Sequence, residues 1–307
     1  MRLHCTEERI DASDAGLINQ QPAIAYHAGN RVGESPAWHP QQSALYWIDV
    51  RRQQLLKLEP ERKHLSRWHL PDVVGASALC SSGKVWLALR HGLSALDVAT
   101  GELQEISQVE TGNQENRLND GKVSPSGRWF LFGSMNDLPQ KQPTGALYCA
   151  ASGGAVRQLW RGLTVCNGIA FSPDASTLYF SDSAMGRVMR AKWDEGHGEM
   201  GAPELWSVLD EASGRPDGAV VDAAGHYWSA GVSAGCLNEV AVDGQCVRTL
   251  ALPCRAPTMA AGGGPAAGTL YVTSLVRENW AAPGPIEGAL LAFPAPAKGA
   301  FGTLLNA

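Results

Sequence analysis

The stretch "SPDASTLYFSDS", residues 172–183, decides the fold class. A turn rich in Ser, Pro and Asp leads directly into a run of aromatic and apolar residues, which is typical of a tight turn followed by a short buried β-strand. The same arrangement occurs five more times along the chain. The other copies are "HPQQSALYWIDV" from His39, "CSSGKVWLALR" from Cys80, "SPSGRWFLFGS" from Ser124, "DAAGHYWSAG" from Asp222 and "GPAAGTLYVTS" from Gly264.

The spacing of these copies identifies the architecture. They begin at residues 39, 80, 124, 172, 222 and 264, so successive copies lie 41, 44, 48, 50 and 42 residues apart. A period of about 40 to 50 residues with several short strands in each unit is typical of a β-propeller. One four-stranded blade cannot bury both of its faces, whereas six blades in a ring bury each face against a neighbour. The sequence therefore predicts an all-β, six-bladed β-propeller of four-stranded antiparallel blades, with a β-sandwich of coincidental spacing as the alternative.

The chain shows no linker and no break in composition. We therefore expect a single propeller domain over residues 23–307, preceded by an N-terminal extension over residues 1–22. The role of this extension cannot be read from its sequence, and nothing in the chain indicates an oligomeric state.

Composition and charge exclude several classes of partner. The chain has a net charge of -5 and no basic stripe, so a nucleic-acid partner is not expected. No apolar run approaches the roughly 20 residues that cross a bilayer, and the polar N-terminus has no apolar segment of the kind found in secretory signals.

The seven cysteines are odd in number and include no Cys-x-x-Cys pair. This usage predicts buried free thiols in a reducing cytoplasm, rather than a disulfide framework or a zinc-thiolate cluster.

Four polar residues occupy equivalent positions in different repeats. Each lies five residues before the start of a copy of the turn; they are Glu34, Asn119, Asn167 and Asp217. Equal offsets in a ring place side chains at equal depth near the axis, so we expect these four to converge. Two carboxylates and two amides form an oxygen donor set, which suits a divalent cation. No histidine or cysteine shares the offset, which argues against a zinc-type cage. Taken singly, each residue could instead cap a turn.

Four motifs carry a resemblance to a known family. They are "GESPAWHP" (33–40), "NRLNDGKVSPSGRWF" (116–130), "NGIAFSPDASTLYFSDS" (167–183) and "RPDGAVVDAAGHYW" (215–228). In the order and spacing of these four motifs, the sequence resembles the senescence marker protein, regucalcin and gluconolactonase family. The resemblance implies one divalent metal ion in the channel, which in the family is calcium, zinc, manganese, magnesium or iron. Members of the family hydrolyse aldonolactones.

Carried over by position, the resemblance implies roles for individual residues. Glu34, Asn167 and Asp217 correspond to metal ligands, whereas Arg117 and Asn119 correspond to positions that contact the sugar substrate. The resemblance also implies a position near the metal for Asn119. Some members of the family have an acidic residue shortly after the third-blade strand that contacts substrate, and whether Asp137 fills this role is left open.

These residues predict a hydrolytic mechanism. A bound cation can polarise a lactone carbonyl and lower the pKa of a water molecule. Asp217 is the candidate general base toward that water, and Arg117 with Asn119 would hold sugar hydroxyls or the developing oxyanion. The prediction is a metal-dependent sugar lactonase of carbohydrate catabolism. The alternatives are a metal-dependent esterase acting on phosphotriesters or aryl esters and a non-catalytic, calcium-binding propeller. A serine hydrolase is not expected, since the chain has no Gly-x-Ser-x-Gly.

Overall fold

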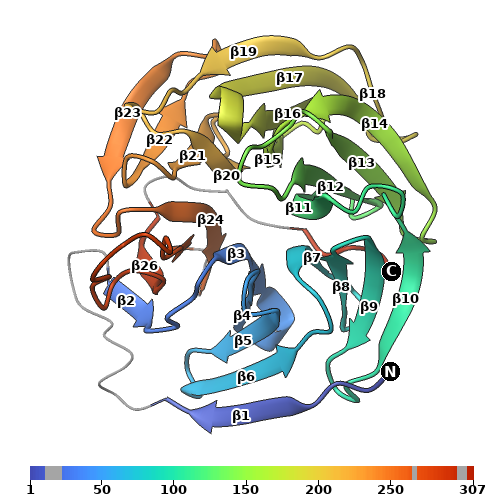
Figure 1. Ribbon diagram of the computed structural model, residues 1–307, viewed down its shortest axis with the longest axis vertical. Coiled ribbons are helices and arrows are strands. Elements are labelled where there is room, and N and C mark those ends of the chain that lie inside the picture. The colour runs from blue at the N-terminus through green and yellow to red at the C-terminus, as the bar shows by residue number, and fades with distance from the viewer. Residues whose placement is uncertain (11–22, 265–267, 296–302) are drawn as a thin grey trace.

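The protein is a ring of six antiparallel sheets around a central channel (Figure 1). The computed structural model describes residues 1–10, 23–264, 268–295 and 303–307. Residues 11–22 of the predicted extension and residues 265–267 of the sixth predicted turn lie outside the described residues. The ring confirms the predicted six-bladed β-propeller.

The sheets follow one another along the chain, and every blade begins at the channel and ends at the outer edge. The first three blades are β3 (Gly33–His39), β4 (Ala44–Asp49), β5 (Gln54–Glu59) and β6 (His64–His69); β7 (Val74–Leu79), β8 (Lys84–Leu89), β9 (Gly92–Asp97) and β10 (Leu103–Gln108); and β11 (Asn116–Val123), β12 (Trp129–Asn136), β13 (Gly145–Ala151) and β14 (Val156–Leu163).

The other three blades follow the same plan, with small additions. They are β15 (Cys166–Phe171), β16 (Thr177–Asp182) and β17 (Arg187–Asp194), with β18 (Glu199–Met200) and β19 (Glu204–Val208) both paired to β17; β20 (Pro216–Val221), β21 (Tyr227–Gly231), β22 (Cys236–Val240) and β23 (Cys246–Ala251); and β24 (Pro257–Gly263), β25 (Thr269–Ser274) and β26 (Leu290–Pro294). Two short 3-10 helices, η1 (Pro40–Gln42) and η2 (Ser183–Met185), flank β4 and β16.

The repeated turn joins the first and second strands of a blade. The strand after each turn is β4, β8, β12, β16, β21 or β25. The first strands, which surround the centre of the ring in Figure 1, therefore lie just before each turn. A residue at a fixed offset before the turn thus falls on a channel-lining strand in every blade.

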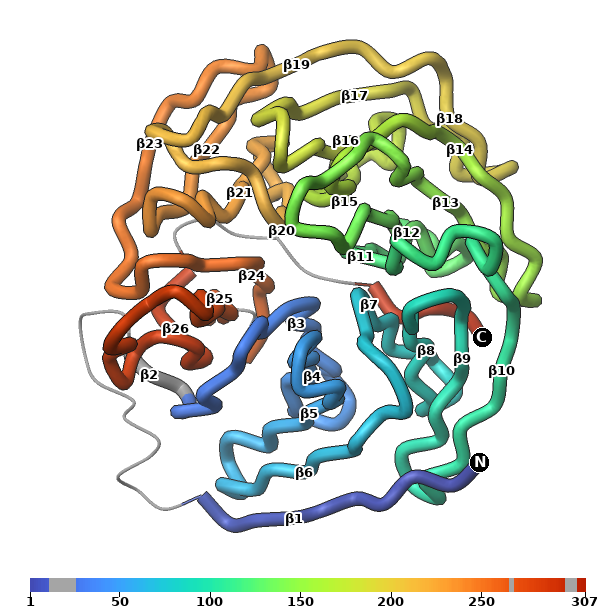
Figure 2. Tube along the Cα trace, viewed as in Figure 1, coloured from blue at the N-terminus to red at the C-terminus, as the bar shows by residue number. Residues whose placement is uncertain are grey.

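The N-terminal region completes two of the blades. β2 (Ala23–Tyr26) pairs with β26, so a strand from near the start of the chain closes the sixth blade (Figure 2). β1 (Cys5–Arg9) pairs along β6 and adds a fifth strand to the first blade. Covering this outer edge removes a row of unpaired backbone groups that would otherwise face solvent. The predicted boundary between residues 22 and 23 coincides with the start of β2 and stays a prediction.

The core consists of apolar clusters between neighbouring blades. One cluster joins Ala76 of β7 to Leu118 of β11 and Phe130 of β12, all fully buried. This close approach depends on Gly75, because a Cβ atom there would lie 2.1 Å from the carbonyl oxygen of Leu118. A larger residue at position 75 would push the second and third blades apart.

All seven cysteines are free, as predicted, but two of them are not buried. Cys246 is exposed and Cys5 is half-buried, because each lies on the outermost strand of a blade. The prediction that every thiol is buried was therefore wrong at these two positions. In the part of the chain that the structure describes, no helix is long and apolar enough to cross a membrane.

Candidate functional site

The four residues with equal offsets come from four different channel-lining strands. Glu34 lies on β3, Asn119 on β11, Asn167 on β15 and Asp217 on β20, and all four are buried. We call these four residues the hub. Asn119 Nδ2 donates to Asn167 Oδ1 at 3.1 Å, and Asn167 Nδ2 donates to Asp217 Oδ1 at 2.6 Å. Glu34 completes the group through its electrostatic interaction with Asp217.

The first strand of every blade contains a β-bulge at the level of the hub. The pairing of each channel-lining strand with its neighbour shifts register at this level in all six sheets. The residues after three hub positions have positive φ angles, 52° at Ser35, 24° at Asp120 and 59° at Gly168. A bulge changes the direction in which a strand's side chains point, and bulges are common beside functional sites. Here the bulge follows the hub residue directly.

Gly168 shows why the sequence requires glycine at one of these bulges. A Cβ atom there would lie 2.2 Å from the Tyr227 hydroxyl oxygen, and the positive φ disfavours other residues. Tyr227 Oη also donates to the carbonyl oxygen of Gly168 at 2.8 Å. The neighbouring blade therefore fixes the backbone beside Asn167.

Two aspartates fix the loops that lead into the hub strands. Asp49 accepts hydrogen bonds from the backbone N–H groups of residues 31 and 32, at 2.9 and 3.1 Å, just before β3. Asp182 accepts the equivalent bonds from residues 164 and 165, at 2.8 and 3.2 Å, just before β15. Both aspartates end the second strand of their blade, in "YWID" and "YFSD". This shared motif was the signal in the sequence that could have identified them.

Sequence reasoning assigned no role to Asp120, which is a third buried carboxylate beside the hub. Its Oδ1 accepts from Gly121 N at 2.7 Å and its Oδ2 from Ile169 N at 3.0 Å, so it ties the third blade to the fourth. Lys122 is the cation that interacts with it most directly, and burial lowers the pKa of Lys122 to about 8. We call Glu34, Asp120 and Asp217 the hub carboxylates.

Burial disfavours the ionised form of all three hub carboxylates, although the nearby charges of Arg117, Lys122, Arg215 and Arg277 act in the opposite direction. Burial and, after it, the nearby charge of Asp120 raise the pKa of Asp217 to about 8. Burial, followed by the charges of Asp217 and Asp120, raises the pKa of Glu34 well above its ordinary value. Like charges in a poorly solvated site disfavour ionisation unless a cation accompanies them.

The donor set fits a divalent cation in its chemistry. Carboxylate and amide oxygens are the ligands that hard cations prefer. The Asn167 side chain is not oriented as a metal ligand would be. Its amide turns the nitrogen, and not the oxygen, toward Asp217. A rotation of about 180° of this amide exchanges the two atoms and would present the oxygen. In the absence of a cation, the nitrogen is the atom that the carboxylate favours.

Arg117 links the hub to a second polar group. Its Nη1 donates to Asn119 Oδ1 at 2.7 Å, and its Nε donates to Asp137 Oδ1 at 3.2 Å. Burial lowers the pKa of Arg117 to about 10, which leaves it charged at neutral pH. Arg117 is buried, unlike an ordinary surface arginine.

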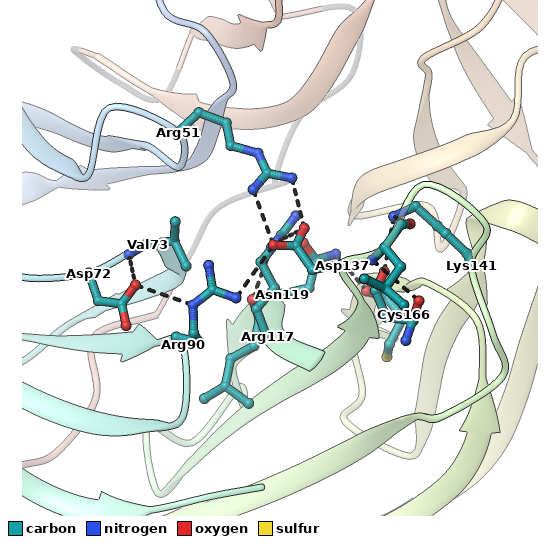
Figure 3. A network of polar contacts seen from close by, with 12 residues as sticks. Arg51, Asp72, Val73, Arg90, Arg117, Asn119, Asp137, Lys141 and Cys166 are labelled. Carbon is teal, nitrogen blue, oxygen red and sulfur yellow. Dashed lines mark hydrogen bonds and ion pairs between the residues drawn. The ribbon is translucent and has the colours of Figure 1, made fainter. Parts of the chain in front are cut away.

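Asp137 is the centre of an arginine cluster (Figure 3). Arg51 donates to it through two nitrogens, at 2.7 and 3.2 Å, and Arg90 Nη1 lies 3.5 Å from its Oδ2. Burial alone would raise the pKa of Asp137, but Arg51 and Arg117 bring it below the ordinary value. We call Arg51, Arg90 and Arg117 with Asp137 the arginine rim.

A second group of possible metal ligands lies in the fifth blade. Asp222, His226 and Glu239, which we call the blade-5 triad, place one ligand atom each within 4.8 Å of the others. Their atoms already have partners, however. Glu239 accepts from Arg248 Nε at 2.6 Å and contacts His226 Nδ1 at 2.5 Å, and Asp222 accepts from Trp228 Nε1 at 2.9 Å. The two carboxylates of the triad thus already accept hydrogen bonds from neighbouring side chains.

A cavity of about 310 Å³ lies toward the end of the channel at which the first strands finish and the repeated turns begin. Pro36, Phe171 and Val220 line it, and all three follow the hub residue on their strands. Its lining is mainly apolar and includes no hub residue, so it is distinct from the candidate site.

The fold and the hub together define the class of this protein as a six-bladed β-propeller with a buried, acidic polar site on its axis. The chain belongs to the SMP-30/gluconolactonase/LRE-like family, whose region matches residues 32–276.

Several relatives are similar over most of their length. The chain is 37% identical to a 6-deoxy-6-sulfogluconolactonase from Pseudomonas putida, over 85% of this chain and 87% of that protein. It is 30% identical to a pentonolactonase from Haloferax volcanii, over 80% of this chain and 81% of that protein. Among solved structures, it resembles the calcium-binding protein regucalcin from Agrobacterium tumefaciens with a TM-score of 0.86 and 30% identity, over 92% of this chain and 96% of that one.

Proposed function

We propose that the protein is a divalent-metal-dependent hydrolase that opens sugar lactones to aldonic acids in carbohydrate catabolism. The observation that carries this proposal is the concentration of three buried carboxylates at the hub, where burial raises the pKa of each. Membership of a family that contains sugar lactonases supports the reaction class.

Glu34, Asn167 and Asp217 would hold the cation. A divalent cation bound there would supply a Lewis acid for the lactone carbonyl and would acidify water. An all-oxygen donor set favours calcium, magnesium or manganese over softer metals, and zinc and iron remain alternatives. The solved relative described as a calcium-binding protein supports calcium as the first choice.

Asp217 would act as the general base. Its Oδ1 accepts a hydrogen bond within the hub, and its position on the axis lets it take a proton from a water molecule that attacks the lactone. It must be ionised to do so, and a cation beside it lowers its pKa from the raised value. Asp217 therefore requires both burial and a compensating positive charge.

Arg117 and Asn119 would position the substrate. Arg117 uses Nε and Nη1 for contacts within the protein, and its Nη2 has no partner among the described residues. A charged donor at this point can hold a hydroxyl or stabilise the oxyanion that forms at the carbonyl. The free thiols support a cytoplasmic location as part of this proposal.

A lactone panel with and without metal tests the proposal. The purified protein is treated with EDTA, dialysed and assayed by proton release on five- and six-membered aldonolactones, with spontaneous hydrolysis subtracted. We expect no enzymatic turnover without metal, and turnover after a divalent cation is added. Equal rates under both conditions would contradict metal dependence, and no turnover of any lactone with any cation would contradict the function.

A second candidate function is calcium binding without catalysis, favoured by the description of the solved relative. Calorimetry with calcium alone separates the two. Tight calcium binding by a protein that hydrolyses none of the lactones, and no phosphotriester or aryl ester either, would support the second function.

A further inference from the structure

The arginine rim is built from equivalent turns of three neighbouring blades. Arg51 and Arg90 follow the second strands β4 and β8, and Asp137 directly follows β12. The turns after second strands surround the same mouth of the channel as the hub. The rim is therefore a feature of the site's mouth, and not of the outer surface.

The rim carries more positive charge than its carboxylates neutralise. Arg51, Arg90, Arg117 and Lys141 interact with Asp137, and Arg90 also pairs with Asp72 at 3.3 Å. The rim thus contains four cations and two carboxylates, and one of these cations, Arg117, also interacts with Glu34 of the hub. One guanidinium is enough to pair with one carboxylate, so the stability of Asp137 alone does not account for three arginines.

The two outer arginines are accessible and have donors to spare. The side chain of Arg51 is 40% exposed and that of Arg90 is 27% exposed. Contacts within the described residues use two of the five N–H donors of Arg51, both on Asp137. Arg90 uses Nε on Asp72, and its Nη1 lies at ion-pair distance from Asp137. Both can therefore bind an oxyanion without losing their present partners.

The turns after the second strands of the fourth and fifth blades lack this charge. The turn after β16 contains Ala184 and Met185, and the turn after β21 contains Val232 and Ser233. Arg215 and Arg277 of the fifth and sixth blades also lie at this mouth, where they interact with Asp217 of the hub, and Arg277 Nη2 donates to the carbonyl oxygen of Val232 at 3.2 Å. The cations that surround Asp137 come from blades one to three.

The rim and the hub are joined by one side chain, Arg117, which contacts Asp137 with Nε and Asn119 with Nη1. One guanidinium group therefore separates Asp137 of the rim from Asn119 of the hub, and a single sugar can span that distance. We propose that Arg51 and Arg90 bind an anionic group of the substrate, so that the preferred substrates are sugar lactones bearing a phosphate, sulfonate or carboxylate at the end remote from the lactone carbonyl. This inference rests on the proposed function and specifies its substrate class.

The test compares lactones that differ only in this group. Glucono-1,5-lactone is assayed beside its 6-phosphate, its 6-deoxy-6-sulfonate and the corresponding 6-carboxylate, with the wild type and with R51Q/R90Q. We expect the wild type to show kcat/KM at least about tenfold higher for one or more of the anionic lactones, because charge-assisted bonds from arginine are strong. The ratio of anionic to neutral kcat/KM should fall by about 10- to 100-fold in R51Q/R90Q. The lactone whose ratio falls most identifies the anionic group.

Arg190→Gln is the matched control. Arg190 is 41% exposed, like Arg51, and pairs with Glu204 at the outer edge of the fourth blade. This variant should keep the wild-type ratio. A wild type that prefers the neutral lactone, or a double variant with an unchanged ratio, would overturn the inference.

A binding measurement keeps the inference separate from the proposed function. Calorimetry compares 6-phosphogluconate with gluconate, which are open-chain acids and need no turnover. A preference for the phosphorylated acid that R51Q/R90Q removes supports the inference, even for a protein that hydrolyses no lactone. Equal binding of the two acids by the wild type overturns it.

Discussion

The hub and the blade-5 triad are two groups of carboxylates in one molecule, and they differ in how their charge is compensated. Asp217 in the hub and Glu239 in the triad have the same exposed fraction, 8%. Glu239 contacts His226 and Arg248 directly, whereas Asp217 contacts an amide and interacts with Asp120, Arg215 and Arg277 without forming an ion pair among the described residues. Burial is therefore the same, and the direct partners of the two carboxylates differ.

This difference separates a structural cluster from a candidate site. The triad satisfies a simple geometric criterion for a metal site, because its three ligand atoms lie close together. Its carboxylates already contact Arg248, His226 and Trp228, so a cation would have to displace these partners. At the hub, a cation would relieve repulsion that the fold itself leaves in place. We therefore propose the hub, and not the triad, as the metal site.

The largest expected effect is on catalysis by Asp217→Asn. This change removes the general base and one carboxylate ligand while keeping the shape of the side chain. We expect kcat for lactone hydrolysis to fall by about 10³-fold, in the range usual for loss of a general base. Steady-state kinetics with saturating metal measures it. A loss smaller than tenfold would show that Asp217 is not the base.

The next effect is on stabilisation by metal. A ligand at 100 times its Kd stabilises the native state by about 2.7 kcal/mol, so a divalent cation should raise the Tm of the wild type by several degrees. Glu34→Gln removes a charged ligand and should abolish most of this increase at the same metal concentration. Thermal unfolding followed by circular dichroism, across calcium, magnesium, manganese and zinc, provides the measurement. If the full increase persists in Glu34→Gln, the cation does not bind at the hub.

The fold could be predicted from the sequence because its determinants are local. Each turn and the strand after it are adjacent in the chain, so "SPDASTLYFSDS" and its five relatives show the period directly. The pairing of β2 with β26 could not be predicted, since it joins the two ends of the chain and depends on closure of the ring. Four residues of β2 contain too little pattern to indicate a partner.

The candidate site was predictable in part, for a related reason. The offset located Glu34 and Asp217 because every channel strand precedes its turn by a similar length. The bulge at Asp120 and the convergence of Arg51 on Asp137 were not predictable, because they depend on contacts between different blades. Sequence shows which residues share a level of the channel, whereas the structure shows how their charges balance.

A smaller effect concerns the pH dependence of stability in the metal-free protein. The pKa of Asp217 is about 8 in the folded state, above the ordinary aspartate value of 3.8 that we take for the unfolded chain. A raised folded pKa gives stability that is present below the unfolded pKa and is lost as pH rises through the folded pKa. The metal-free wild type should therefore lose stability between about pH 4 and pH 8.

Asp217→Asn isolates this contribution, because asparagine does not titrate. Its Tm should fall less steeply over the same pH range, and saturating metal should flatten the wild-type profile in the same way. Parallel profiles for the metal-free wild type and the variant would mean that the hub carboxylates do not repel one another as inferred.

The smallest expected effect is that of Glu239→Gln in the triad. Its partners Arg248 and His226 are 50% and 31% exposed, so solvent screens these pairs and their loss should cost only about 1 kcal/mol. The increase in Tm on adding metal and the kcat for lactone hydrolysis should both stay at wild-type levels, since the triad has no part in either. The same thermal unfolding and kinetic assays measure this variant beside Glu34→Gln. If Glu239→Gln abolished the metal-dependent increase and Glu34→Gln kept it, the two clusters would have exchanged roles, and compensated charge would not distinguish them.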